Sequence, residues 1–288
     1  MKYLKDIVLT ALAPFVWGST YYVTTQFIPD GHPLAISLLR IVPAGLLLFL
    51  LVKEFPSRSL WVKLLILGTL NFALFWWLLF EAAYRLPGGI AATLGATQVI
   101  LVIVLSKFVL QSKVTFSAVL FAGLGALGVG LMLFTPIDKL DLMGVLAGFA
   151  SALSMALGTV LSKHWKPPVP TLTFTCWQLC AGGIVLSPFV IFLEVEFPSV
   201  TVASICAISY LSLIGAAFTY LLWFRGISKL SPNLISPLGL FSPISAVLLG
   251  WIMLDESLNA IQILGFISAL ISIVFCQHTQ RPKRSRLN

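Results

Sequence analysis

Arg40 is a permanently charged residue inside an otherwise apolar stretch that covers residues 34–52. A charge at membrane depth is costly unless it meets a polar cavity or a partner. The planar guanidinium can hold a carboxylate through two parallel hydrogen bonds. Two interpretations stay open: Arg40 is a clamp for the carboxylate of a bound substrate, or it is a structural charge bonded to helix-end carbonyls or to Glu81.

Glu81 is the one acid that falls inside an apolar stretch, near the end of residues 64–82. If burial raises its pKa toward physiological pH, its carboxyl group can carry a proton. Arg85 follows four residues later, which on a helix is the spacing of an ordinary ion pair. Glu81 is therefore the candidate for proton coupling, and a pair with Arg85 is the alternative that the spacing favours.

Several aromatic residues also lie inside apolar stretches, where rings can line a site for flat or apolar solutes. For most single rings, core packing or lipid contact is the better explanation. Trp17 and Trp177 are the exceptions, because Thr20 lies close to the first and Gln178 lies beside the second. Trp77 and Tyr220 join these four residues in the candidate cavity. The complete set of candidate rings is Trp17, Trp76, Trp77, Trp177, Tyr220 and Trp223.

The apolar stretches that position these residues are each about as long as a bilayer is thick. In hydrocarbon a backbone must satisfy its hydrogen bonds within its own segment, so these stretches are predicted to be transmembrane helices. Ten of them use nearly all of the 288 residues and leave no room for a soluble domain. The predicted spans are 7–27, 34–52, 64–82, 88–106, 115–134, 143–162, 171–193, 203–224, 233–254 and 260–277.

The chain is 59% apolar and 10% charged, with a net charge of +8. Such a charge can indicate a nucleic-acid binder. However, all Lys and Arg residues except Arg40, Arg85 and Lys139 fall at one set of alternate span ends. The positive-inside rule places those ends, and both termini, in the cytoplasm. The basic excess thus predicts a multi-pass topology, and nucleic acid is not an expected partner.

The sequence repeats itself. The run that opens at Pro33 resembles the run that opens at Pro170, and the residues from Tyr84 resemble those from Ser228, 144 positions later. The predicted parts are a first repeat at 1–136 (spans one to five), a second repeat at 137–280 (spans six to ten) and a basic cytoplasmic tail at 281–288.

Five spans in each repeat is an odd number, so the second repeat is predicted to sit upside down relative to the first. Inverted repeats are typical of transporters, because two mirrored halves can rock about a site at their interface. A duplicated scaffold with no transport role is the alternative.

Enzyme chemistry is not indicated. Intramembrane hydrolases need paired acids or histidines at membrane depth, whereas this chain has one acid in a span and its three histidines lie in loops or tails. The sequence has no G-x-x-x-x-G-K-[ST] loop for a nucleotide. Its four cysteines form no C-x-x-C pair. No metal site and no cofactor are therefore expected.

Three segments resemble the EamA repeat of the drug/metabolite transporter superfamily. They are WGSTYYVTTQF from Trp17, YRLPGGIAATLGA from Tyr84 and TCWQLCAGG from Thr175. Within the family they are most similar to the PecM-type pigment and metabolite exporters. The resemblance implies an all-α integral membrane fold of ten transmembrane helices in two inverted five-helix EamA repeats. It also implies a central cavity lined mainly by spans one to four and six to nine, with spans five and ten packed behind it.

Two further candidates come from this resemblance. Many EamA repeats carry a proline in span four, where this chain has Gln98, an amide that can form hydrogen bonds. The second half keeps the proline, Pro243, next to Ser242. Gln98 and Ser242 are therefore included in the candidate substrate-binding cavity.

The resemblance implies a secondary transporter in a bacterial inner membrane. It would export amino acids, their derivatives or aromatic, pigment-like compounds from the cytoplasm by alternating access. The expected partners are a small-molecule substrate and membrane lipids, with protons as the candidate coupling ion. A facilitator or importer of the same solutes, and a structural membrane protein that transports nothing, stay open as alternatives.

Overall fold

The computed structural model describes residues 2–28, 32–86, 94–112, 114–132, 141–193, 201–253 and 259–279. Every regular element within these ranges is a helix. The predicted tail at 281–288, the predicted repeat boundary at 136/137 and the first part of predicted span four lie outside the described residues.

The helices follow the predicted spans in chain order and differ from them mainly at their ends and breaks. The elements are α1 (Lys2–Phe27), α2 (Pro33–Val52), η1 (Arg58–Leu60), α3 (Trp61–Gly68), η2 (Thr69–Ala73), α4 (Leu74–Arg85), α6 (Gln98–Val109), α7 (Phe116–Met132), α8 (Leu142–His164), α9 (Thr171–Leu193), α10 (Val202–Ser212), η3 (Leu213–Phe218), α11 (Thr219–Lys229), α12 (Pro232–Ile235), η4 (Ser236–Leu240), α13 (Phe241–Met253) and α14 (Ala260–Thr279).

Within the described residues, six helical segments are long and apolar enough to cross a membrane, and four shorter apolar helices accompany them. The shorter ones correspond to predicted spans four, five, nine and ten. The long segments are Leu4–Thr24, Pro33–Val52, Arg58–Arg85, Leu142–His164, Thr171–Leu193 and Val202–Lys229.

Predicted spans three and eight are not the regular helices that the sequence suggested. Each lies within a composite helix of 28 residues that contains a π-helical segment, η2 in one and η3 in the other. The first residues of the two segments, Thr69 and Leu213, are 144 positions apart, which is the repeat offset seen in the sequence. A π segment widens one turn of a helix and shifts its carbonyl groups, and such segments are frequent at functional sites.

Predicted span nine is broken where the sequence suggested one continuous helix. A short α12 leads into the 3₁₀ segment η4, and only then does α13 begin. Pro237 occupies the start of η4. Proline has no backbone N–H and its ring clashes with the carbonyl of the preceding turn, so an α-helix cannot run through it unchanged.

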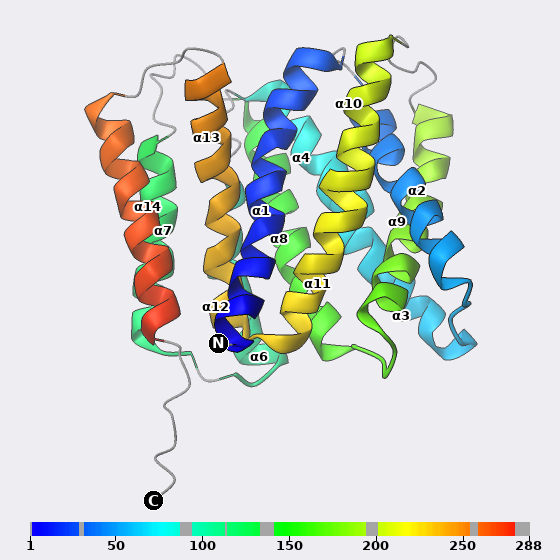
Figure 1. Ribbon diagram of the computed structural model, residues 1–288, viewed down its shortest axis with the longest axis horizontal. Coiled ribbons are helices and arrows are strands. Elements are labelled where there is room, and N and C mark those ends of the chain that lie inside the picture. The colour runs from blue at the N-terminus through cyan, green and yellow to red at the C-terminus, as the bar shows by residue number, and fades with distance from the viewer. Residues whose placement is uncertain are drawn as a thin grey trace, which may run out of the picture.

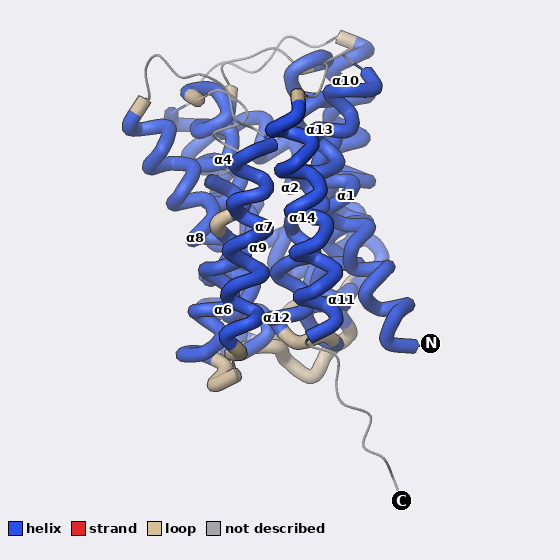
Figure 2. Tube along the Cα trace, turned by 90° about the vertical axis from the view of Figure 1, so that its left-hand side faces the viewer, coloured by secondary structure: helices blue, strands red, loops and turns tan. Residues whose placement is uncertain are grey.

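The helices run roughly along one common axis (Figures 1 and 2). At one edge α7 and α14 pack against each other, while α2 packs on α9, α4 on α8, and α1 on both α13 and α11. The position of α7 and α14 at the edge agrees with the expectation that spans five and ten lie behind a central cavity.

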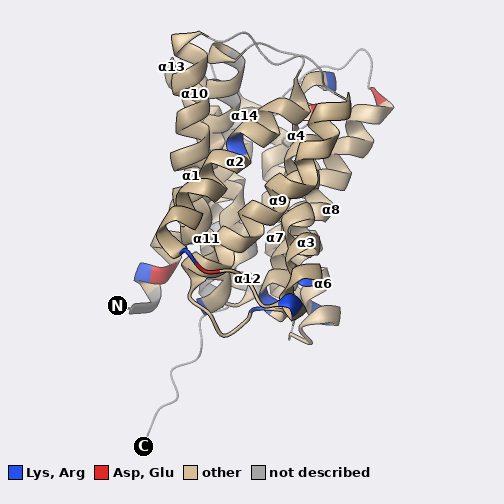
Figure 3. Ribbon diagram, turned by 90° about the vertical axis from the view of Figure 1, so that its right-hand side faces the viewer, with Lys and Arg blue, Asp and Glu red and all other residues tan. Residues whose placement is uncertain are grey.

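The first and last described helices, α1 and α14, begin and end at the same end of the bundle (Figure 1). Lys and Arg residues gather at that end (Figure 3). This is the one-sided distribution that the sequence predicted for the two termini.

Helices α1 and α13 come into very close contact at Gly18. A Cβ atom on Gly18 would lie 1.7 Å from Ser245 Oγ and 2.4 Å from the carbonyl oxygen of Ser242. Ser245 Oγ in turn donates a hydrogen bond to the carbonyl of Phe15 at 2.7 Å. The missing side chain at Gly18 thus lets a helix from the first half touch the backbone of a helix from the second half.

Candidate functional site

A central cavity of about 100 Å³ lies between the helices of the two halves. Its walls come from α1, α4, α6 and α8, together with α11, η4 and α13. The walls are mostly aromatic and aliphatic, with hydroxyl and amide groups between them. Among the predicted site residues, those that line this cavity are Trp17, Thr20, Gln98 and Ser242.

The cavity also contains residues outside the predicted substrate-binding set, although two of them, Trp76 and Trp223, were among the candidate rings. Trp76 and Trp223 supply rings, while Ser151 and Thr159 of α8 supply hydroxyl groups. The candidate Trp77 is absent from the described lining, and its neighbour Trp76 takes that position. Consecutive residues of a helix point about 100° apart, so a Trp-Trp pair offers one ring to the cavity and the sequence does not say which.

Arg40 is 1% exposed and does not belong to the described lining. Its Nη1 donates to Thr20 Oγ1 at 3.1 Å, and its Nη2 donates to the carbonyl oxygen of Gly215 at 2.9 Å. The guanidinium carbon also lies 3.7 Å from the centre of the Trp76 ring, a distance at which a cation is attracted to the ring face. Arg40 therefore lies behind the cavity wall and holds it in place.

These contacts match the structural interpretation of Arg40, with two corrections. The carbonyl partner belongs to the π segment η3 rather than to a helix end, and Glu81 is engaged elsewhere. Gly215 accepts a second hydrogen bond from the Thr219 hydroxyl at 2.8 Å, and that hydroxyl accepts one from Trp17 Nε1 at 2.8 Å. A chain of hydrogen bonds through Gly215 and Thr219 thus joins Arg40 to Trp17, whose ring lines the cavity.

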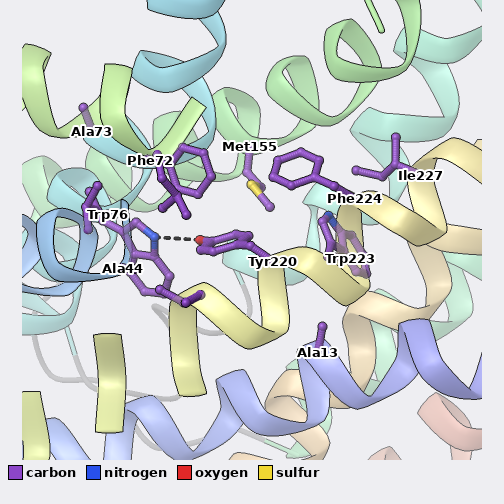
Figure 4. Close-up of a cluster of buried hydrophobic side chains, with 14 of the residues drawn as sticks. Ala13, Ala44, Phe72, Ala73, Trp76, Met155, Tyr220, Trp223, Phe224 and Ile227 are labelled. Carbon is purple, nitrogen blue, oxygen red and sulfur yellow. Dashed lines mark hydrogen bonds between the residues drawn. The ribbon is translucent and has the colours of Figure 1, made fainter. Parts of the chain in front are cut away.

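Tyr220 lies behind the cavity, fully buried, and is not part of the described lining. Its phenol oxygen accepts a hydrogen bond of 2.7 Å from Trp76 Nε1 (Figure 4). Its ring centre lies 4.6 Å from that of Phe72 and 5.2 Å from that of Trp17. Trp76 and Tyr220 are 144 residues apart, so they occupy equivalent positions of the two repeats.

Gln178 and Trp177 do not line the central cavity, contrary to the prediction. Gln178 Oε1 accepts hydrogen bonds from Asn71 Nδ2 at 2.9 Å and from Ser162 Oγ at 3.1 Å. Asn71 lies in η2, so Gln178 reaches the π segment of the first half much as Arg40 reaches that of the second half. The repeat that opens at Pro33 and Pro170 pairs Arg40 with Trp177, so Gln178, the next residue, makes the comparable contact with an amide in place of a cation.

Trp177 faces another part of the protein. Its Nε1 donates to the carbonyl oxygen of Glu54 at 2.8 Å, in the segment between α2 and η1. The ring lines a second, largely apolar groove of about 390 Å³. The Glu54 carbonyl thus binds the indole N–H of Trp177. The repeat pattern could not predict this hydrogen bond, because residue 54 lies outside the predicted spans.

Glu81 forms the pair that the spacing favoured. Arg85 Nε donates to Glu81 Oε1 at 2.6 Å, and Arg85 Nη1 lies 3.3 Å from Asp141 Oδ2. The side chains of Arg85 and Glu81 are 43% and 27% exposed, so solvent screens their attraction. Asp141 also caps α8, and its hydrogen bond from the Gly144 backbone N–H is the main cause that lowers its pKa.

We expect Glu81→Gln to leave the pH dependence of transport unchanged and to alter stability by only about 0–1 kcal/mol, because exposed ion pairs contribute little. The measurement is solute flux in proteoliposomes across an imposed pH gradient, for the wild type and the variant. Lys107→Gln, at another polar position, serves as the charge-removal control. Loss of the pH response in Glu81→Gln alone would instead assign proton coupling to this carboxyl group.

Comparison with known proteins identifies the family. The model of the EamA-like transporter family matches this chain twice, over residues 4–134 and 142–276. The chain belongs to the EamA-like transporter family. The two matches cover both halves, so the EamA unit is present in two copies.

Among EamA-like relatives, Protein PecM of Dickeya dadantii (strain 3937) is 39% identical over 95% of this chain and 92% of its own length. The probable amino-acid metabolite efflux pump of Escherichia coli (strain K12) is 23% identical over 91% of each chain. A solved structure titled "Crystal structure of protein" superposes with a TM-score of 0.78 at 17% identity, covering 96% of this chain and 99% of that one. That likeness supports the fold of the EamA-like chain.

Proposed function

We propose that this protein is a secondary transporter that exports small organic metabolites from the cytoplasm of a bacterium by alternating access. The observation that carries the proposal is the central cavity, which is enclosed by helices of both EamA copies at the level of the membrane-length segments. A site at the interface of two repeats is what a rocking mechanism needs.

Export is the favoured direction because one relative is named a probable amino-acid metabolite efflux pump. Amino acids, their derivatives and aromatic compounds are the proposed range of solutes. Import or facilitated diffusion of the same solutes is the second candidate function, because a cavity between two repeats serves either direction.

The proposed architecture is ten membrane spans in two inverted repeats, 1–136 and 137–280, with both termini in the cytoplasm. The matches to two EamA copies and the common end of α1 and α14 support it. The paired π segments support it as well, because they recur at the repeat offset.

Cysteine labelling of whole cells tests the proposed orientation. In a background without the native cysteines, single cysteines at Lys113 and Lys283 should resist a membrane-impermeant maleimide, while those at Asp138 and Glu194 should react. The prediction follows from the excess of basic residues at one set of span ends. Labelling from outside at position 113 would contradict the inverted arrangement.

The transport proposal is tested with proteoliposomes that are loaded with a bacterial metabolite extract, followed by mass spectrometry of the released compounds. Wild-type protein should release a subset of solutes faster than empty liposomes. Ala152→Phe, which fills the cavity from α8, should abolish that release. Ala203→Phe, at an exposed position of α10, should not. Equal release by all three proteins and by empty liposomes would refute transport.

A further inference from the structure

Two buried polar atoms in the cavity-lining residues have no hydrogen-bond partner among the described residues. They are Nε1 of Trp223 and Oγ1 of Thr159. Trp223 is 1% exposed and Thr159 is 4% exposed, and both residues line the central cavity. A buried polar group without a partner costs free energy, so a solute in the cavity that satisfies these groups gains a directional interaction.

The chemistry of these two groups defines what they can recognise. An indole N–H is a donor only, whereas a hydroxyl both donates and accepts. Trp223 lies in α11 and Thr159 in α8, two helices that contact each other. Together the two groups offer a solute between α8 and α11 one donor, suited to a carbonyl oxygen or a ring nitrogen, and one hydroxyl that can donate or accept.

The charge pattern argues for an uncharged solute. Every described residue of the cavity lining is neutral. The nearby cation, Arg40, is already bonded to Thr20 and to the carbonyl of Gly215, with its face against Trp76. A carboxylate in the cavity would be attracted by the positive field of Arg40 but would lose its hydration without a direct ion pair, which is expensive. A cation would meet both that cost and the positive field of Arg40.

The walls argue for a flat solute. Trp17, Trp76, Trp223 and Phe75 all line the cavity, and the rings of Trp17 and Trp223 lie 5.2 Å apart at their centres. Aromatic walls bind planar, weakly polar molecules through area burial and ring contacts.

We infer that the cavity selects an uncharged, planar solute with a hydrogen-bond acceptor, and that Trp223 donates to that acceptor beside the Thr159 hydroxyl. This inference rests on the proposed transport function and narrows it: free amino acids and other zwitterions are poor ligands. Trp223 and Thr159 are specificity-determining residues.

The test is equilibrium dialysis of the purified full chain in detergent, with binding to protein-free micelles subtracted. Coumarin and 2-quinolone are the neutral carbonyl probes, and coumarin-3-carboxylate is the charged one. Trp223→Phe keeps a ring but removes the N–H donor, and Thr159→Val removes the hydroxyl at nearly constant volume. Trp251→Phe, at a tryptophan that is 52% exposed on α13, is the matched control.

Wild type and Trp251→Phe should bind a neutral probe saturably. Trp223→Phe should weaken that binding about tenfold, and Thr159→Val several-fold, as expected for lost hydrogen bonds. Coumarin-3-carboxylate should bind at least about tenfold more weakly than coumarin, because its charge stays unpaired. Unfolding curves check that each variant is folded. If Trp223→Phe does not fold, Thr159→Val alone tests the inference.

The inference is overturned if neither neutral probe binds, if Trp223→Phe and Thr159→Val both bind like Trp251→Phe, or if the carboxylate binds as tightly as coumarin. These outcomes differ from a failure of transport. Release of only charged metabolites by the proteoliposomes would keep the transport proposal and reject the inference. Binding that depends on Trp223 but is not accompanied by release of any solute would keep the inference about the cavity and reject the transport proposal.

Discussion

Arg40→Ala should lower the free energy of unfolding by about 3–5 kcal/mol. This is the range for truncating a large buried side chain together with the loss of its buried hydrogen bonds. The change removes donors to Thr20 and to the Gly215 carbonyl and uncovers one face of Trp76. Arg40→Lys should recover little, because an ammonium cannot reach both oxygens and also lie flat on a ring. Denaturant titration of the detergent-solubilised protein measures the effect.

The matched control for this experiment is Arg58→Ala, which changes an exposed arginine in η1. Surface substitutions of this kind usually stay within about 0.5 kcal/mol of the wild type. If Arg40→Ala were as stable as Arg58→Ala but lost affinity for carboxylate solutes, Arg40 would be the substrate clamp that the sequence left open.

Gly18→Ala should be strongly destabilising, at about 3 kcal/mol, the upper end for overpacking. The new methyl group would lie 2.4 Å from the carbonyl oxygen of Ser242, a backbone atom that cannot rotate away. Helices α1 and α13 would have to separate, which displaces Trp17 and Ser242 at the cavity. We therefore expect reduced transport along with a lower melting temperature.

Gly123→Ala provides the opposite case. Apart from the adjoining residues and the backbone of its own helix, no heavy atom lies within 4 Å of the Cβ that it would add in α7, and alanine favours a helix over glycine by about 1 kcal/mol. This variant should be as stable as the wild type or more so. Comparable losses in Gly18→Ala and Gly123→Ala would show that helix propensity, rather than the contact of α1 with α13, sets the cost.

The sequence predicted the helices well because apolar length alone decides membrane spans. It did not predict the π segments η2 and η3, since no residue type marks them: Asn71 occupies one and Gly215 the other. The break at Pro237 was readable in principle, because proline interrupts a helix, but the apolar run around it concealed the change from α-helix to the 3₁₀ segment η4.

The candidate site was predicted in part, for a similar reason. Trp17, Thr20, Gln98 and Ser242 line the cavity. Arg40 was also predicted to need a partner inside the bundle. Its partner is the carbonyl of Gly215, which lies 175 residues away in the chain. Trp177 was misplaced because a backbone carbonyl outside the spans binds it. Contacts to main-chain atoms of distant segments leave no trace in side-chain patterns.

The hydrogen bond between Trp76 and Tyr220 has a mechanical consequence. Under the proposed inverted arrangement, a transport cycle lets each half adopt the shape of the other, so a contact that one half makes with the other, such as that of Arg40 with Gly215, trades places with the contact at the equivalent positions. The Trp76–Tyr220 bond joins equivalent positions of the two repeats, so exchanging the halves maps this bond onto itself. The indole can only donate, so the phenol accepts before and after the exchange. The Trp76–Tyr220 bond can thus act as a fulcrum, stationary near the centre of the bundle while the two ends of the cavity swing about it.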